Sequence, residues 1–339
     1  MQSQTLLQID ESSQVGHARR MALEMARKLG FDEEQAGKVA LAVNECASNI
    51  LKHAGRGQLM LRPIHCEGTD GIEIVAIDKG PGIADVSASL RDGHSTSGTM
   101  GGGLGALARL SPAFEIFTQP GKGTAIRIAL WSRPIPNTWQ PIEFGGVCVP
   151  LHTEPVSGDD WTVELWRDRA AVLLADGLGH GILAHEASRA ATQTLLAHRE
   201  LTPERIMDLA HGALARTRGA AVAVAHLFAA EQRGSFAGVG NIVTRIEGGP
   251  ANRHLISHNG TVGHTMRKLQ EFAFPWPKHA LLVMHSDGIG THWDFANYPG
   301  LTTKHPALIA AVLYRDYDRG RDDASVVVIR NRGSVAGNP

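Results

Sequence analysis

Four short aspartate clusters lie in the second half of the sequence, each next to an apolar run. They are SGDD at 157–160, ADGLGHG at 175–181, HSDG at 285–288 and RDDAS at 321–325. A single aspartate in such a position is most often a turn or capping residue. Four clusters at the ends of predicted strands instead favour one site where carboxylates converge. The candidate ligands are the side chains of Asp159 or Asp160, Asp176, Asp287 and Asp322 or Asp323, together with the Gly177 carbonyl.

These clusters supply hard oxygen ligands without cysteine or paired histidine spacing. Such a ligand set favours Mg²⁺ or Mn²⁺ over zinc. Two such ions about 3.5–4 Å apart can activate a bridging water and stabilise the charge on phosphoryl oxygens. The second half of the chain therefore predicts hydrolysis of a phosphate ester.

The first half contains a carboxylate and an amide four residues apart in LAVNECASN. Glu45 and Asn49 share one face of a predicted helix with Leu41 and His53. The amide oxygen can bind Mg²⁺, and the carboxylate can orient or deprotonate an attacking hydroxyl. Such a pair is by itself typical of an exposed helix face, so its meaning depends on the motifs that follow.

Asp78 follows the apolar run IEIVAI and precedes KGPG. A carboxylate at a strand end can accept the amino hydrogen of adenine, and Gly80 and Gly82 let a base approach the backbone. By itself DKGPG is typical of a β-turn. Thr124 in the later segment GKGT can join Asp78 at the adenine edge.

A glycine run, GTMGGGLG, precedes the short helical segment ALARL. Glycines leave backbone amides open to phosphate oxygens, and the start of a helix adds a favourable dipole. A flexible loop is the alternative interpretation of the same run. The candidate phosphate-binding residues are Gly98, Gly101, Gly103 and Gly105.

The elements that position these residues differ between the two halves. The first half predicts helices over 12–29 and from 32 to about 54, followed by strands in QLMLRPI, GIEIVAID, FEIFT and TAIRIAL. This order predicts a two-layer α/β sandwich. The second half contains many apolar strand runs and three helical segments, which predict a β-sandwich with helices outside. The proline-rich segment WSRPIPNTWQP separates the halves. We therefore expect domains at 1–131 and 142–333, a linker at 132–141 and a tail at 334–339.

Composition excludes several other classes of protein. Apolar residues make up 43% and charged residues 20% of the 339 positions, as in globular proteins. A net charge of −1 and a pI of about 7.0 argue against electrostatic binding of nucleic acid or anionic lipid. Three cysteines without a CxxC pair, and a start without a signal-peptide pattern, predict a cytoplasmic protein. The most apolar stretch, 220–230, is too short to span a bilayer and predicts a buried strand.

The motifs of the first half, in this order, resemble the GHKL (Bergerat) ATP-binding fold. The segments NECASNILKHAGRGQ, DKGPGIADVSASLRDGHSTSG and GGLGALARL with GKGT resemble the RsbT-type switch serine kinases over about residues 5–130. The resemblance implies that Asn49 binds Mg²⁺, Glu45 is the catalytic base and Asp78 anchors the adenine of ATP. It also implies STAS-domain proteins as substrates. Met100 and three successive glycines in the lid depart from the family pattern.

The motifs of the second half resemble the SpoIIE/RsbX branch of the PPM metal-dependent Ser/Thr phosphatases over about residues 142–331, which implies an αββα sandwich. The resemblance implies that Asp176 bridges two Mn²⁺ or Mg²⁺ ions and that Asp287 and Asp322 bind one of them. It places Asp159 in the outer shell, with Asp160 or Asp323 as alternatives. His180, His258 and His264 are further candidates, for which a structural role is the more common one.

Three functional hypotheses follow. The leading one is a fused kinase and phosphatase that act on STAS-domain proteins. A second is a nucleotide-dependent module that sequesters a partner, as anti-sigma factors do, joined to an active phosphatase; Glu45 argues against it, because a pure adaptor needs no base. A third is a phosphatase whose ATP site only senses nucleotide. The sequence does not determine the oligomeric state.

Overall fold

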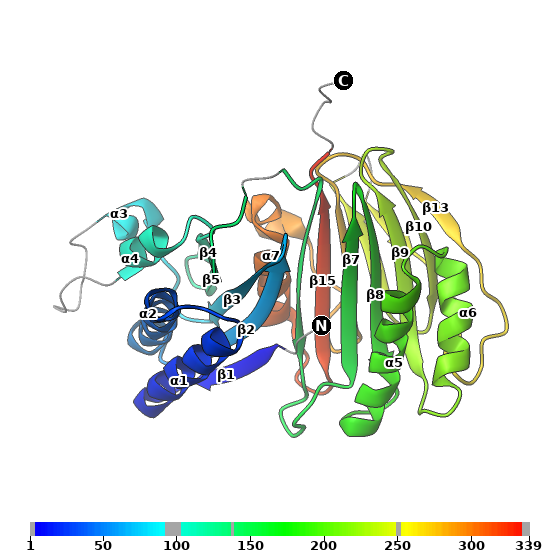
Figure 1. Cartoon of the computed structure of the whole chain (residues 1–339), viewed down its shortest axis with the longest axis horizontal. Helices are drawn as coiled ribbons and strands as arrows, with labels where there is room; N and C mark the ends of the chain where they lie inside the picture. The colour runs from blue at the N-terminus through cyan, green and yellow to red at the C-terminus, as the bar shows by residue number, and fades with distance from the viewer. Residues whose placement is uncertain (1–3, 92–102, 137–138, 249–251, 334–339) are drawn as a thin grey trace. The chain divides into compact units, whose positions relative to one another are not determined.

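The computed structural model describes residues 4–91, 103–136, 139–248 and 252–333. The chain divides into two compact units. The first comprises Met1–Thr138 with Gly300–Lys304, and the second comprises Trp139–Pro299 with His305–Pro339. Figure 1 labels their helices and strands, and each unit is described by itself.

The first unit is a five-stranded antiparallel sheet with helices on one face. The strand order is β1-β2-β3-β5-β4. The strands are β1 (Thr5–Ile9), β2 (Gly57–Cys66), β3 (Thr69–Asp78), β4 (Glu115–Gln119) and β5 (Gly123–Trp131). The helices are α1 (Ser12–Lys28), α2 (Glu33–Asn49), a π-helix (Ile50–Ala54), α3 (Val86–Leu90) and α4 (Gly103–Leu110).

Local sequence explains where α1 and α2 begin and how they pack. Glu11 and Gln14 form a capping box at the start of α1, and the Asp32 carboxylate accepts a hydrogen bond from the backbone N–H of Gln35 at 2.7 Å. Ala18, Ala22 and Ala26, at a spacing of four, are fully buried on α1. Small side chains at this spacing let α1 lie close against its neighbours.

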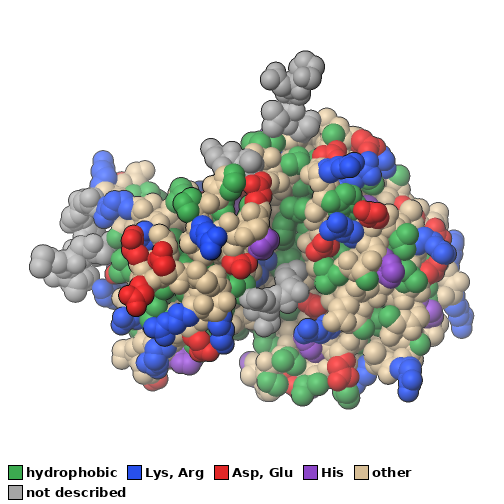
Figure 2. Space-filling model, viewed as in Figure 1, with side chains coloured by type: hydrophobic (Ala, Val, Ile, Leu, Met, Phe, Trp, Pro, Cys, Tyr) green, Lys and Arg blue, Asp and Glu red, His purple; other side chains and the backbone are tan. Residues whose placement is uncertain are grey.

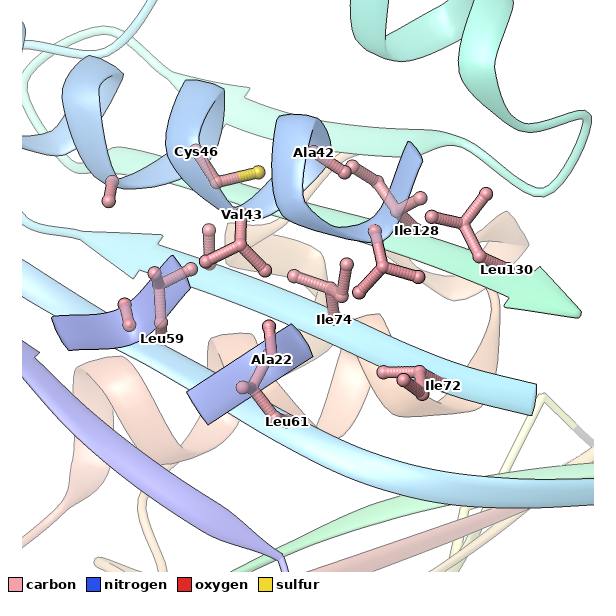
Figure 3. Close-up of a cluster of buried hydrophobic side chains, with 14 of the residues drawn as sticks. Ala22, Ala42, Val43, Cys46, Leu59, Leu61, Ile72, Ile74, Ile128 and Leu130 are labelled. Carbon is pink, nitrogen blue, oxygen red and sulfur yellow. The ribbon is translucent and has the colours of Figure 1, made fainter. Parts of the chain in front are cut away.

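Figure 3 shows the core of this unit, where α1 and α2 face the sheet. Burying branched aliphatic side chains contributes roughly 1.5–3 kcal/mol each, so this layer holds α2 firmly on the sheet. The labelled residues come from α1 (Ala22), α2 (Ala42, Val43, Cys46), β2 (Leu59, Leu61), β3 (Ile72, Ile74) and β5 (Ile128, Leu130).

The second unit consists of two five-stranded antiparallel sheets with helices on their outer faces. The sheet orders are β13-β10-β9-β8-β7 and β12-β11-β14-β15-β6. The first sheet comprises β7 (Asp159–Trp166), β8 (Arg169–Gly177), β9 (Ala220–Phe228), β10 (Arg233–Val239) and β13 (Phe272–Pro275). The second comprises β6 (Ile142–Val149), β11 (Val243–Glu247), β12 (Arg253–Leu255), β14 (Leu281–His285) and β15 (Ala324–Asn331).

Three helices complete this αββα arrangement. α5 (Ile182–His198) and α6 (Pro203–Leu214) cover β8 and β9, and α7 (Pro306–Tyr317) packs on β6 and β15. β8 and β9 therefore face apolar layers on both sides, which explains their nearly continuous apolar sequences. The prediction of a buried strand within 220–230 is confirmed by β9.

Two short 3₁₀ helices, Phe295–Asn297 and Leu301–Thr303, precede α7. The three cysteines are free. Within the residues that the structure describes, no helix has the length and apolar character needed to cross a membrane.

Candidate functional site

The predicted carboxylate and amide of the first half lie in the last two turns of α2. Val43, Cys46 and Ala47 turn into the core, whereas Glu45 and Asn49 are partly exposed. α2 ends at Asn49 and continues as a π-helix over Ile50–Ala54, rather than as the regular helix expected to about residue 54. Single π turns are frequent at functional sites, and this one directly follows the predicted Mg²⁺ ligand.

Asp78 ends β3, and its carboxylate is fixed by two backbone donors. Its Oδ1 accepts hydrogen bonds from the N–H of Gly80 at 2.8 Å and from the N–H of Thr124 at 3.2 Å. The Thr124 hydroxyl lies 3.1 Å from the Thr118 hydroxyl, which accepts a hydrogen bond from the N–H of Ile83 at 2.9 Å. The structure thus brings Asp78, Gly80 and Thr124 together.

The glycines of this site also serve close backbone packing. A Cβ at Gly82, whose φ is +73°, would lie 2.3 Å from the Gln119 carbonyl oxygen. A Cβ at Gly80 would lie 2.7 Å from the Ala54 Cβ, and one at Gly123 would lie 2.0 Å from the Asp78 carbonyl oxygen. Sequence reasoning assigned Gly80 and Gly82 only to base approach and missed Gly123, although its place in GKGT was the available signal.

The glycine run is described only in part. Gly98 and Gly101 lie outside the described residues. Gly103 is exposed with a φ of +52° and begins α4, while Gly105 is buried within the first turn of that helix. The helix therefore begins earlier than the predicted segment ALARL. The first backbone N–H groups of a helix have no intrahelical partner, so this turn can still offer donors to an anion.

In the second unit, antiparallel pairing of β7 with β8 sets Asp159 opposite Asp176. Asp159 is 2% exposed, and its Oδ2 is buried without a hydrogen-bond partner among the described residues. Asp176 is partly buried near the end of β8, and Gly177 is the last residue of that strand. The N–H of Gly177 donates to the Gly158 carbonyl at 3.1 Å, which ties the two clusters together.

The remaining two clusters meet where β14 and β15 pair. The N–H of Ser286 donates to the Ser325 carbonyl at 3.1 Å, and the N–H of Ser325 donates to the Ser286 hydroxyl at 3.0 Å. Asp287 accepts a hydrogen bond from the Asn241 amide at 2.8 Å. The structure therefore places Asp287 beside the segment that carries Asp322 and Asp323. The sequence did not indicate Asn241 as a partner of Asp287, because the segment GNIV contains no motif.

The structure separates the two alternative outer-shell residues. Asp323 Oδ1 accepts from the N–H of Leu151 at 2.8 Å, and its Oδ2 is buried without a partner in the described part of the chain. Asp160 instead accepts hydrogen bonds from the N–H of Trp161 at 2.9 Å and from the Thr192 hydroxyl on α5 at 2.6 Å. Asp160 therefore holds α5 on β7, whereas Asp323 belongs to the carboxylate cluster.

Burial and mutual repulsion raise the pKa values of these carboxyl groups. Burial, and then the charge of Asp159, raise the pKa of Asp176 to about 9. Burial is the main cause that raises the pKa of Asp159 to about 7, and it also raises the pKa of Asp287 and of Asp323. Divalent cations would relieve this repulsion, and the water bound to them would pair with the unpartnered oxygens, so the residues fit a metal centre.

Across the described ranges, no three His, Cys, Asp or Glu side chains are already arranged as ligands of one metal ion. The carboxylates influence one another electrostatically, while Asp323 accepts a hydrogen bond from the Leu151 N–H and Asp287 accepts one from the Asn241 amide. Mg²⁺ commonly keeps several water ligands and binds through one or two carboxylates. An open cluster of this kind suits an ion of that type better than a closed structural zinc site.

The three candidate histidines have different surroundings. His180 Nδ1 lies 2.6 Å from the Glu154 carboxylate, in the segment that directly follows Asp176 and Gly177. His258 stacks on Phe272 with ring centroids 6.0 Å apart. His264 Nε2 lies 3.2 Å from the Thr217 carbonyl oxygen. The contacts of His258 and His264 are those of structural residues.

Comparison with known proteins agrees with this arrangement. The histidine kinase-like ATPase domain family matches residues 10–130. The Bacillus subtilis serine/threonine-protein kinase RsbT is 35% identical over 133 residues, which are 39% of this chain and 100% of RsbT. The N-terminal part of this chain belongs to the RsbT family. The remainder of the chain needs a separate comparison, by structure.

Three solved structures resemble the chain. RsbX in complex with magnesium is 17% identical, with a TM-score of 0.50 over 57% of this chain and 97% of RsbX. The Bacillus subtilis SpoIIE structure, with its PP2C phosphatase domain, is 18% identical, with a TM-score of 0.50 over 94% of this chain and 92% of that chain. A structure from a study of the bacterial stressosome is 25% identical, with a TM-score of 0.52 over 56% of this chain and 99% of that chain. The prediction of a GHKL kinase domain followed by a PPM phosphatase fold is confirmed.

Proposed function

We propose that this chain phosphorylates and dephosphorylates serine or threonine residues of STAS-domain proteins. The kinase domain occupies residues 1–131 and the phosphatase domain residues 142–333. The observation that carries the proposal is the presence, in one chain, of an RsbT-family domain and a PPM fold with a cluster of buried carboxylates. The similarity to a stressosome structure supports STAS-domain partners.

In the kinase domain, each predicted residue has a distinct task. The Asp78 carboxylate, fixed by Gly80 and Thr124, accepts the hydrogen bond of the adenine amino group. Asn49 holds Mg²⁺, and Glu45 on the same helix face takes the proton of the attacking hydroxyl. The bound Mg²⁺–ATP supplies the phosphoryl group. Because Glu45 and Asn49 are one turn apart, proton acceptance and metal binding occur side by side.

In the phosphatase domain, two Mn²⁺ or Mg²⁺ ions are held by the carboxylates of Asp176, Asp287 and Asp322 and by the Gly177 carbonyl. These ions supply an activated water. Asp159 and Asp323 are buried with one unpartnered oxygen each, so they suit outer-shell contacts through water. The His180–Glu154 pair beside them can orient the phosphate of the substrate.

The decisive experiment separates the two activities with labelled ATP. Purified STAS-domain proteins from the same genome are incubated with the chain and Mg²⁺–ATP, and phosphoserine and phosphothreonine are mapped by mass spectrometry. Wild-type chain is expected to form phosphoprotein, and Asp176→Asn is expected to make it accumulate. ATP binding without any phosphoprotein would favour the sequestering module and refute the kinase proposal.

Fusion of opposed activities has a physical consequence for the partner. A protein bound to one domain meets the other at an effective concentration set by the linker rather than by its concentration in solution. Futile cycling is avoided if the two domains act on different phosphosites. Mapping the sites with each domain disabled in turn distinguishes one shared site from two separate ones.

A further inference from the structure

A groove lies between α1 and α2 in the first unit. Its volume is about 520 Å³. All of its lining residues come from the two helices and the turn that joins them, so it is a property of this unit alone. They are Arg19, Leu23, Arg27, Phe31, Asp32, Glu33, Ala36, Gly37, Ala40, Leu41 and Asn44.

The wall that α1 contributes is positively charged. Arg19, Leu23 and Arg27 follow one another at a spacing of four and so lie on one face of the helix. Both arginines are exposed, and neither forms an ion pair or side-chain hydrogen bond within the described ranges. By contrast, the nearby lysines outside the groove are paired, Lys28 with Glu24 at 2.7 Å and Lys38 with Glu34 at 2.8 Å. Figure 2 shows Lys and Arg side chains over the region where Figure 1 places these helices.

The floor of the groove is apolar and open. Leu41 is 44% exposed, although most leucines of this unit are buried. Gly37 is exposed in the interior of α2, and a Cβ added there would meet nothing within 4 Å. Glycine disfavours a helix relative to alanine, and no contact within the chain requires it here. A glycine at this position instead keeps the floor accessible to a second molecule.

The groove lies next to the predicted phosphoryl-transfer residues. Leu41, Glu45 and Asn49 recur every four residues along one face of α2. Leu41 lines the groove, and Glu45 follows it by one turn. A protein segment bound against Leu41 therefore lies one helical turn from the proposed proton acceptor.

We infer that this groove docks an amphipathic helix of the phosphoryl-acceptor protein, with acidic residues toward Arg19 and apolar residues on Leu41 and Gly37. The inference rests on the proposed function, because it names how the acceptor of that kinase is held. Acidic residues complement the unpaired arginines. Glu33 and Asp32 lie at the other end of the groove, and the Asp32 carboxylate caps α2 there. The acidic end of the docked helix therefore points toward Arg19, away from Asp32 and Glu33.

The test measures initial rates of phosphoryl transfer by the full chain against the concentration of a purified STAS-domain protein that the wild type phosphorylates. Arg19→Glu and Leu41→Glu are each expected to raise the KM for that protein by about tenfold or more, with the KM for ATP unchanged. Arg20→Glu is the matched control, because it makes the same charge change on α1 outside the groove and should leave both KM values unchanged. Hydrolysis of p-nitrophenyl phosphate should be the same in all three variants.

A second variant distinguishes weaker docking from a loss of stability. Gly37→Ala is expected to raise the melting temperature by a few degrees, because alanine favours helix and meets no neighbour, and yet to raise the KM for the acceptor protein. An unchanged KM for the acceptor in both Arg19→Glu and Leu41→Glu would overturn the docking inference while leaving the kinase assignment intact. If the wild type phosphorylates no STAS-domain protein, the proposed function is refuted, and the docking inference is refuted with it because there is no acceptor protein to dock.

Discussion

Substitution of Glu73 tests a buried charge cluster in the sheet that carries Asp78. Glu73 on β3 accepts hydrogen bonds from Arg62 Nε at 3.1 Å and Nη2 at 2.5 Å, and from Arg127 Nε at 2.7 Å. The relative exposures of these side chains are only 2% for Glu73, 8% for Arg62 and 9% for Arg127. One carboxylate therefore compensates two guanidinium groups that water hardly reaches.

Glu73→Gln removes this charge with little change of shape. The free energy of unfolding of the first unit should fall by about 3–5 kcal/mol, because the substitution removes a buried charge that compensates two buried guanidinium groups. In a unit of this size, the corresponding fall in melting temperature is about 10 °C or more. Thermal unfolding followed by circular dichroism, with and without ATP, measures this change.

The matched control replaces the whole cluster by apolar side chains of similar size, as in Arg62→Met with Glu73→Leu and Arg127→Met. This triple variant should be close to wild type in stability, since no buried charge remains. A Glu73→Gln protein that unfolds within 1 °C of wild type would show that water compensates the arginines. It would thereby refute the reasoning from burial.

Three further predictions concern the two sites and the core of the second unit. Asp176→Asn should abolish Mn²⁺-dependent release of phosphate from a phosphoprotein and leave ATP affinity unchanged; retained turnover would remove Asp176 from the metal centre. Asp78→Asn keeps an Oδ1 acceptor for the N–H groups of Gly80 and Thr124 but loses the negative charge, so the fold should stay intact. Calorimetry should show that ATP binds about tenfold more weakly or worse. An unchanged affinity for ATP would mean that adenine binds elsewhere. Burial lowers the pKa of His226 to about 4. Folding therefore favours the neutral imidazole, so this residue stabilises the folded state fully above its ordinary pKa of 6.5. As the pH falls from 7 to 5, the free energy of unfolding should decrease by about 2 kcal/mol on account of His226. Urea unfolding at the two pH values should show a loss that is smaller by about this amount in His226→Leu than in wild type, because His285, whose pKa burial also lowers to about 4, titrates in both proteins. Equal losses in the two proteins would contradict the prediction.

Local patterns predicted most elements and supplied the candidate residues of both sites, which stay predictions. The capping residues, the apolar spacing of α1 and α2 and the strand-end aspartates are all visible in short segments of sequence. Features that depend on distant segments were not predictable in this way. The π turn after Asn49 lets Ala54 pack against Gly80, and the close approach of Gly82 to Gln119 depends on how the β4–β5 hairpin meets the segment after β3.

The choice between Asp160 and Asp323 shows the same limit within the candidate metal centre. Each lies in a pair of adjacent aspartates, and nothing local distinguishes them. The distinction comes from α5, where the Thr192 hydroxyl donates a hydrogen bond to the Asp160 carboxylate, and from Leu151, whose N–H donates one to Asp323. Both contacts join segments more than 30 residues apart, so they follow from the tertiary fold.

The hydrogen bonds of Asp78 affect how other members of this family can be interpreted. Its Oδ1 joins β3, the following turn and the start of β5, so this aspartate supports the fold whether or not nucleotide is bound. A descendant that had lost catalysis and become a pure scaffold would still need it. Glu45 and Asn49 form no side-chain hydrogen bond within the described residues, so such a descendant could lose them without penalty. Degenerate pseudokinases of this family should therefore be recognised at positions 45 and 49, and a retained aspartate at position 78 should not be taken as a sign of activity.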